Sequence, residues 1–153
     1  MGKLGKSLYM DFEDVCLIDF IDNVDERGRL TAIEGEGTLP FSIKRVFYVH
    51  QIHDGVARGG HAHRDTDQVL TAVSGSLDVL ISNGVKYKKY CLDNPGKGLF
   101  VPQMLWVGMF NFTPGAICLV FASTKYDQSK SIRTWSQYLE DQGLPYIEEP
   151  KIH

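Results

Sequence analysis

The chain has 153 residues, of which 43% are hydrophobic and 23% charged, and a formal net charge of -3. These values suit one globular domain spanning 1–153 and exclude a disordered or fibrous chain. A mildly acidic chain has no overall attraction to nucleic acid or to an anionic membrane surface, and its longest apolar run, 116–122, is too short to cross a bilayer.

The N-terminal segment and the cysteines both predict a cytoplasmic protein. Acidic side chains at Asp11 and Glu13 interrupt any signal-peptide core, so we do not expect export. Cys16, Cys91 and Cys118 lie far apart and form no CxxC pair. This spacing favours reduced thiols over disulfides or a structural zinc site.

Short strands separated by turns are predicted along most of the chain. Runs of β-forming residues predict strands over 42–49, 68–73, 77–82, 85–92, 99–102, 106–112 and 116–123. Asn83-Gly84 is a strong signal for a tight hairpin, and Asp93-Asn94-Pro95-Gly96 predicts a further turn. Many short strands at intervals of about ten residues are typical of a β-sandwich or barrel.

Only the segment 129–142 has a helical pattern. Ile132, Trp135, Tyr138 and Leu139 would form one apolar stripe on a helix, and Gly143 would end it. The predicted fold class is therefore all-β with one short C-terminal helix.

The residues best suited to chemistry lie together in Arg58-Gly59-Gly60-His61-Ala62-His63. On an extended backbone, side chains alternate, so His61 and His63 would share a face. In a small barrel that face is the interior. Two neighbouring imidazoles suit either metal ligation or proton transfer near neutral pH.

The spacing around the histidines resembles the two cupin signatures. The first matches at Gly55, His61, His63, Gln68 and Gly75, and the second at Gly96, Pro102 and Asn111. A metal-binding cupin has Glu where this chain has Gln68 and His where it has Val107. Two imidazoles alone hold iron, manganese or zinc poorly, so we predict no metal and no cofactor. Asp67 is a nearby carboxylate, but the sequence leaves its face open.

Further landmarks extend over nearly the whole chain. They are Asp25-Glu26-Arg27-Gly28, 40–48, 58–63, 67–70, Gly75-Ser76, Leu92-Asp93-Asn94-Pro95, Trp106, Ala122-Ser123, Tyr126-Asp127 and Ile132-Arg133. Together they resemble the dTDP-sugar 3,4-ketoisomerases, the WxcM-like branch of the cupins. The resemblance implies a jelly-roll barrel that works without metal, as a homodimer with an exchanged N-terminal strand.

The resemblance also implies a reaction. Such enzymes move the carbonyl of dTDP-4-keto-6-deoxyglucose from C4 to C3 through an enediol, and the product leads to 3-amino-3,6-dideoxy sugars of surface polysaccharides or antibiotics. His61 and His63 would transfer the protons, with His61 favoured as the base that takes the C3 proton. Adjacent imidazoles lower each other's pKa, so one acid and one base can coexist.

Several further residues are candidates for substrate binding. Arg45, Arg58 and Arg133 could contact phosphate oxygens, whereas Tyr48 and Trp106 could stack on thymine or line the sugar pocket. In a regular strand Arg45 and Tyr48 face opposite sides, so either a bulge intervenes or one of them serves the other subunit of a dimer. A last candidate is Arg27. At its Arg-Gly landmark, the chain resembles the enzymes that give the galacto product.

Val107, Phe110 and Ser131 stand where relatives have polar groups or Tyr. They predict a more apolar pocket and leave the C4 configuration of the product, galacto or gluco, open.

Two alternative functions remain. One is a non-catalytic cupin that binds a nucleotide sugar, which the loss of polar groups at Val107 and Phe110 favours. The other is a metal-dependent cupin enzyme.

Overall fold

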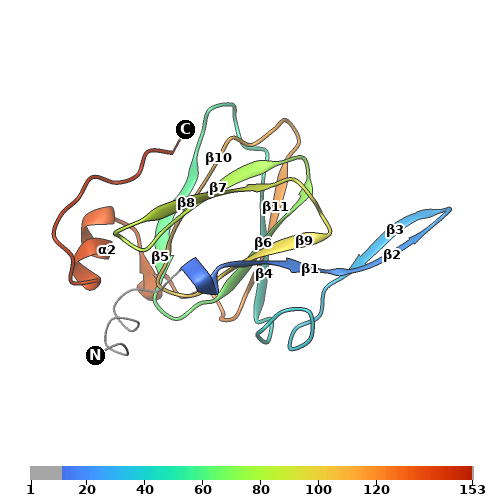
Figure 1. Ribbon diagram of the computed structural model, residues 1–153, viewed down its shortest axis with the longest axis horizontal. Helices are drawn as coiled ribbons and strands as arrows, with labels where there is room; N and C mark the ends of the chain where they lie inside the picture. The colour runs from blue at the N-terminus through green and yellow to red at the C-terminus, as the bar shows by residue number, and fades with distance from the viewer. Residues whose placement is uncertain (1–11, 153) are drawn as a thin grey trace.

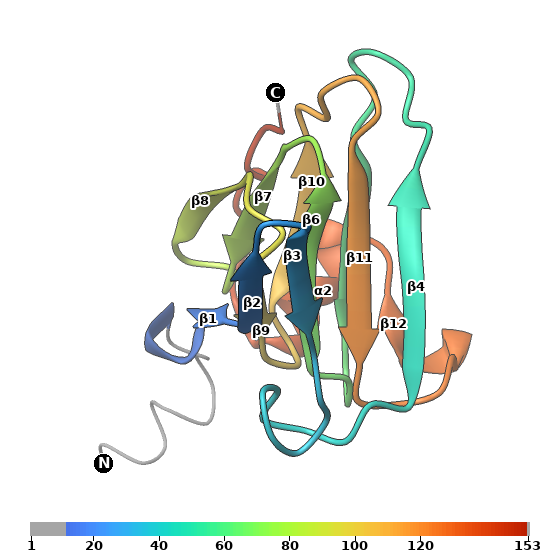
Figure 2. The ribbon, with the colours of Figure 1, turned by 90° about the vertical axis from the view of Figure 1, so that its right-hand side faces the viewer.

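Two five-stranded antiparallel sheets packed face to face make up most of the structure, a computed structural model that describes residues 12–152 (Figures 1 and 2). In spatial order the first sheet contains β1 (Cys16–Asp19), β9 (Lys97–Val101), β6 (Gln68–Ser74), β11 (Ile117–Ala122) and β4 (Arg45–His50). The second contains β12 (Ser131–Ile132), β5 (Arg58–His63), β10 (Trp106–Phe110), β7 (Leu77–Ser82) and β8 (Tyr87–Leu92).

Three kinds of element lie outside these sheets. Strands β2 (Ile21–Asp25) and β3 (Gly28–Ala32) form a two-stranded ribbon that projects from the body of the molecule (Figure 1). Two 3-10 turns, η1 (Phe12–Asp14) and η2 (Gln128–Lys130), precede β1 and β12. The helix α2 (Trp135–Asp141) lies at the opposite end of the molecule from the ribbon (Figure 1).

Alternating side chains along the strands build the core between the sheets. In β4 the residues from Arg45 to His50 alternate strictly between half-buried and exposed, so one face of the strand turns inward. The main core lies between the sheets and includes Leu70, Ile81, Leu99 and Val120. Burial of these apolar groups drives the two sheets together.

Strands and hairpin follow the sequence-based expectation closely. Each of the seven predicted strands is present, β7 with the predicted bounds and the other six with shifted ends, and β7 and β8 pair antiparallel across the predicted turn at Asn83-Gly84. The predicted all-β fold with one short C-terminal helix is confirmed. Sequence patterns did not predict the ribbon β2–β3, strand β1 or the short β12, and they indicated β5 only as a possible extended segment. No helix in residues 12–152 is both long and apolar enough to cross a membrane.

The predicted helix over 129–142 is wrong in its first half. Ser131 and Ile132 instead pair with His63 and Ala62, which makes β12 the edge strand beside β5. The helix begins only after Thr134, whose hydroxyl accepts a hydrogen bond from the Gln137 N–H at 3.3 Å. Tertiary pairing with β5 therefore overrides the helical period of the first residues.

Helix α2 supports the strand that carries the histidines. Trp135 and Tyr138 pack on Trp106 of β10, and their ring centroids lie 5.4 and 5.5 Å, respectively, from that of Trp106. Ala62 of β5 belongs to the same buried cluster. The Tyr138 hydroxyl donates to the Met104 carbonyl at 2.7 Å. The outer face of β5 is thus fixed by apolar packing, which leaves its inner face for the polar site.

Candidate active site

Strand β5 carries the two histidines and is irregular just before them. As β10 advances by one residue, its partner in β5 changes from His61 to Gly59, so Gly60 is an extra residue that forms a bulge. The backbone φ is 89° at Gly59 and 72° at Gly60, values that suit glycine. Because the extra residue shifts the alternation, Arg58 faces the same side of the sheet as His61, three positions away.

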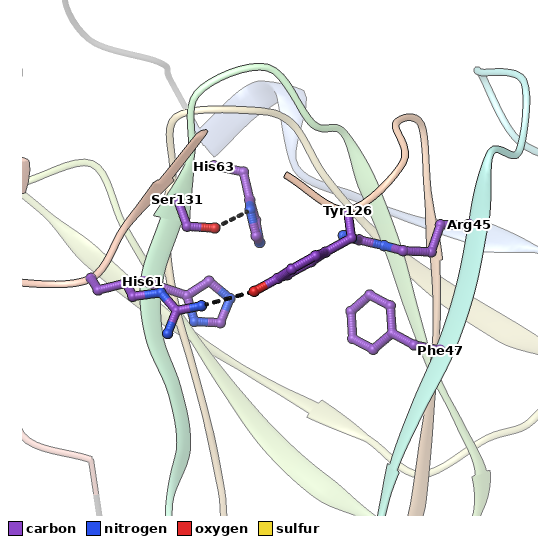
Figure 3. Close-up of a pocket in the computed structure, with 7 residues that line it drawn as sticks. Arg45, Phe47, His61, His63, Tyr126 and Ser131 are labelled. Carbon is purple, nitrogen blue, oxygen red and sulfur yellow. Dashed lines mark hydrogen bonds between the residues drawn. The ribbon is translucent and has the colours of Figure 1, made fainter. Parts of the chain in front are cut away.

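His61 and His63 point into one cavity, as predicted. Their ring centroids lie 4.8 Å apart and the rings meet edge to face at 77° (Figure 3). Ala62 between them is fully buried on the other face of β5. The cavity has a volume of about 310 Å³ and is lined by Arg45, Phe47, His61, His63, Tyr126, Ser131 and Arg133.

A second hollow adjoins the histidine cavity. It has a volume of about 420 Å³ and is lined by Ala57, Arg58, Gly59, Gly60, His61 and Arg133. His61 and Arg133 line both hollows. Each volume falls in the range of small-molecule sites, so the two together can receive a ligand with two distinct parts.

The pKa of His61 lies below its usual value. Burial is the main cause, and the positive charges of Arg133 and Arg58 add to it, while a hydrogen bond to the backbone of Gly59 acts in the opposite direction. The ring is therefore neutral at neutral pH and has a nitrogen able to accept a proton.

His63 is held neutral even more strongly. Burial lowers its pKa to about 4, with further contributions from His61, Arg45 and Arg133, whereas Asp65 opposes the shift. Both of its ring nitrogens contact protein groups: Nε2 lies 3.3 Å from Nε2 of Gln68, and Nδ1 lies 3.4 Å from Oγ of Ser131 (Figure 3). Its ring is thus anchored from both sides.

Arg45 lies across the cavity from the histidines, between two aromatic rings (Figure 3). Its guanidinium carbon is 5.1 Å from the centroid of Phe47 and 5.3 Å from that of Tyr126. Its Nε is buried and has no hydrogen-bond partner within residues 12–152. A buried donor of this kind can serve an anionic or carbonyl oxygen of a ligand.

Tyr126 links the two arginines of the cavity. Its ring faces Arg45, and its hydroxyl accepts a hydrogen bond from Nη2 of Arg133 at 3.3 Å (Figure 3). Tyr126 and Arg133 are both exposed. The pair therefore lies at the mouth of the cavity, where a ligand can meet it.

Three predicted binding residues lie outside the cavity. Tyr48 is 59% exposed on the outer face of β4, beside His50, as strand alternation requires when Arg45 points inward. Trp106 is 2% exposed and packs on the helix instead, which corrects its expected place in the pocket. Arg27 lies on the exposed turn of the ribbon, hydrogen-bonded to Asp25. For Tyr48 and Arg27 a role in binding stays a prediction.

The positions that depart from the family pattern fall in different places. Val107 pairs directly with His61 and is 4% exposed, so an apolar group does adjoin the site. Ser131 lines the cavity. Phe110 is buried on the face of β10 that Trp106 occupies, so its expected effect on the pocket is corrected. The Asp67 carboxylate accepts from the Gln103 N–H at 2.9 Å and does not line the cavity.

Sequence reasoning missed three contributors. Phe47 shares the inward face of β4 with Arg45, and strand alternation alone identifies it once Arg45 is placed. Tyr126 comes from a loop, where no periodicity predicts direction. Gln68 attracted notice only as a replacement for a ligand, and its contact with His63 requires the three-dimensional arrangement.

The donor set does not suit a transition metal. Within residues 12–152 no group of three or more His, Cys, Asp or Glu side chains is placed to hold a metal ion. Beside the two imidazoles lie an amide and a hydroxyl, which are weak ligands for such ions.

Comparison with known proteins gives one consistent result. A family model described as FdtA, WxcM-like, C-terminal, matches residues 13–143. A TDP-4-oxo-6-deoxy-alpha-D-glucose-3,4-oxoisomerase from Aneurinibacillus thermoaerophilus is 37% identical over 122 residues, which cover 80% of this chain and 88% of that protein.

Solved structures of ketoisomerases are also similar. The QdtA sugar 3,4-ketoisomerase from Thermoanaerobacterium thermosaccharolyticum, in complex with TDP, is 36% identical with a TM-score of 0.84, covering 87% of this chain and 97% of that one. The WlaRB TDP-quinovose 3,4-ketoisomerase from Campylobacter jejuni is 38% identical with a TM-score of 0.79, covering 84% and 98%.

Proposed function

The chain belongs to the WxcM-like family of sugar 3,4-ketoisomerases, and we propose that it moves the carbonyl of dTDP-4-keto-6-deoxyglucose from C4 to C3. The observation that carries this proposal is the pair of neutral imidazoles, 4.8 Å apart, in a cavity bordered by Arg45 and Arg133. Relatives with TDP or a TDP-linked keto sugar bound support the choice of substrate.

The reaction needs a base, an acid and a site for negative charge. The C4 ketone acidifies the C3 proton; when a base removes that proton, its electron pair forms the C3=C4 double bond and the carbonyl pair moves to O4. O4 then takes a proton, O3 loses its own, and a proton is delivered to C4 as the carbonyl forms at C3. No atom is gained or lost, and no redox partner is required.

His61 is proposed as the base that takes the C3 proton. Its low pKa keeps it neutral, and it lines both hollows, so a bound sugar can reach it. His63 is proposed as its partner, held by Gln68 and Ser131. After proton transfer, the imidazolium of His61 exchanges its proton with the solvent and is the acid that can deliver a proton to C4.

The arginines are proposed to hold the charged and polar parts of the substrate. Arg58 and Arg133 line the hollow beside His61 and suit diphosphate oxygens. Arg45, with its unpartnered Nε, suits an oxygen of the sugar. With Tyr126 beside it, this cluster can accept the developing enediolate charge.

We further propose that the protein is a homodimer that exchanges an N-terminal strand. Within residues 12–152 of one chain, the ribbon β2–β3 pairs with no other strand, and β4 pairs only with β11. A free strand edge is a ready partner for a second chain. Such a dimer would give Tyr48 and Arg27 a place at a neighbouring site. A cytoplasmic location is part of the same proposal, supported by three free cysteines.

The direct test is incubation with dTDP-4-keto-6-deoxyglucose in deuterated water. The proposal requires a 3-keto product and deuterium on the ring, observed by NMR. If calorimetry shows binding of the dTDP-sugar but NMR shows neither isomer nor exchange at C3, the result would favour a second candidate function. That candidate is a non-catalytic protein that binds a nucleotide sugar, and the apolar Val107 beside His61 is the observation that favours it.

A further inference from the structure

Gln68 is a buried amide in contact with a histidine of the site. It begins β6, is 5% exposed, and places its Nε2 at 3.3 Å from Nε2 of His63. We propose that Gln68 is a positioning residue that holds His63 as a neutral ring with its proton on Nδ1. The inference rests on the proposed function for its catalytic meaning, though not for its geometry.

The direction of the hydrogen bonds gives the tautomer. An amide nitrogen donates and does not accept, so Nε2 of His63 must be the acceptor in its contact with Gln68. The single proton of the neutral ring then lies on Nδ1, which donates to Oγ of Ser131 at 3.4 Å. Gln68, His63 and Ser131 form one chain of donors and acceptors: rotation of the ring would lose both contacts, and a change of tautomer would lose the one with the amide nitrogen of Gln68, because a serine hydroxyl can also donate.

The neutral amide also matters for charge. His63 is surrounded by Arg45 from β4, Arg133 after β12 and His61 on its own strand, all of which disfavour the imidazolium, while Asp65 favours it. A carboxylate in place of the amide would add a negative charge beside Nε2 and stabilise the protonated ring. Gln68 adds a contact without that charge.

The effect on the reaction passes through His61. A protonated His63, with ring centroids 4.8 Å away, would lower the pKa of His61 and weaken it as a base. By holding His63 neutral, Gln68 leaves His61 as the one imidazole of the pair whose charge changes during turnover.

NMR of the full-length protein labelled with 15N-histidine, without substrate and with EDTA present, tests the tautomer. We expect His63 of the wild type to be neutral and protonated on Nδ1 at pH 7. We expect Gln68→Glu to raise its titration midpoint by at least about one pH unit. Gln51→Glu, the same change on an exposed residue, should leave the midpoint unchanged.

A proton on Nε2 in the wild type, or an unmoved midpoint in Gln68→Glu, would overturn the inference. The wild-type spectrum decides the tautomer even if the variant does not fold. Because the spectra need no substrate, a confirmed tautomer with no isomerase activity would count against the proposed function alone.

Kinetics provide the second readout. In Gln68→Glu the acidic limb of kcat should move to higher pH, whereas the uncharged Gln68→Met should lower kcat without moving that limb. The KM should change less than kcat in both, because Gln68 does not line either hollow. Equal pH profiles in all three proteins would contradict the positioning role.

Discussion

At the scale of single residues, the two histidines are held differently. His63 is fixed by contacts at both ring nitrogens, whereas His61 lines both hollows and has a backbone hydrogen bond to Gly59. The anchored ring suits a supporting role, and the ring between the hollows suits direct contact with substrate. Activity and dTDP binding, measured together in variants that remove each ring, test both roles.

We expect His61→Asn to lower kcat by at least about a hundredfold, because the base for the C3 proton is lost. His63→Asn should also lose most activity, since its partner contacts disappear. Both variants should bind dTDP nearly as the wild type does, by calorimetry, because the arginines remain. Full activity in either variant would remove that residue from the mechanism.

The low pKa of His63 predicts a loss of stability in acid. An unfolded histidine titrates near 6.5 and the folded one near 4, so between these values the unfolded chain binds more protons. The contribution is fully present above pH 6.5 and is lost as the pH falls toward 4. After allowance for solvent screening, we expect about 1–2 kcal/mol.

Urea unfolding at pH 7.5 and pH 4.5 measures this effect. Other groups also titrate in this range, so His63→Asn serves as the reference. The wild type should lose more stability than the variant over the same interval. Parallel losses in the two proteins would show that His63 is not the cause.

Tyr126 allows the two contacts of the cavity mouth to be separated. Tyr126→Phe keeps the ring against Arg45 and removes the hydroxyl that Arg133 contacts, whereas Tyr126→Ala removes both. A cation–π contact at an exposed site contributes about 0.5–1 kcal/mol. We therefore expect the Kd for dTDP-sugar to rise by about two- to fivefold more in Tyr126→Ala than in Tyr126→Phe. Equal affinities would show that the ring contact does not order Arg45 for binding.

At the scale of elements, β5 combines chemistry on one face with packing on the other. Its inner face carries His61 and His63, and its outer face carries Ala62 against the helix. The bulge at Gly60 requires close contact with β10: a Cβ on Gly59 would lie 2.9 Å from the Val107 carbonyl oxygen. The position of the site therefore depends on small residues next to it.

We expect Gly59→Ala to destabilise the protein and to reduce activity, because backbone atoms of β10 must move to admit the methyl group. Gly55→Ala is a matched control: φ is also positive, at 76°, but nothing lies within 4 Å of the added Cβ. Thermal unfolding should show the larger loss for Gly59→Ala. Equal losses would mean that the positive φ alone, and not the contact with β10, determines the cost.

Much of β5's surroundings follows from local sequence patterns, and part of it does not. The shared face of the histidines comes from alternation, and the β7–β8 hairpin from Asn83-Gly84. The first half of the predicted helix fails because Ile132 pairs with the edge of β5, a contact distant in sequence. Tyr126 is unpredictable for a related reason, since a loop has no repeating geometry that gives its direction.

At the scale of the whole molecule, several apolar side chains remain exposed on elements with free edges. Val24 and Leu30 on the ribbon and Val46 and Tyr48 on β4 are each more than half exposed. Exposed apolar groups beside unpaired strands indicate contact with another chain. They are the structural basis of the proposed dimer, which local sequence patterns do not reveal.

Light scattering after size-exclusion chromatography should give twice the chain mass of 17.2 kDa for the wild type. Val24→Lys on the ribbon should shift the protein toward one chain per particle and lower its activity, because a charge at an apolar interface is costly to bury. Val85→Lys, at another apolar position that is more than half exposed, on the β7–β8 turn, should do neither. A wild type that elutes as a single chain would contradict the dimer.

The bulge at Gly60 lets the segment before the histidines vary in length without reorienting the site. Loss of one codon between Arg58 and His61 would remove the extra residue and restore regular alternation, with Arg58 still opposite Met109 and on the face of both imidazoles. A deletion of one residue in this short stretch therefore leaves anion recognition and proton transfer on the same side of the sheet.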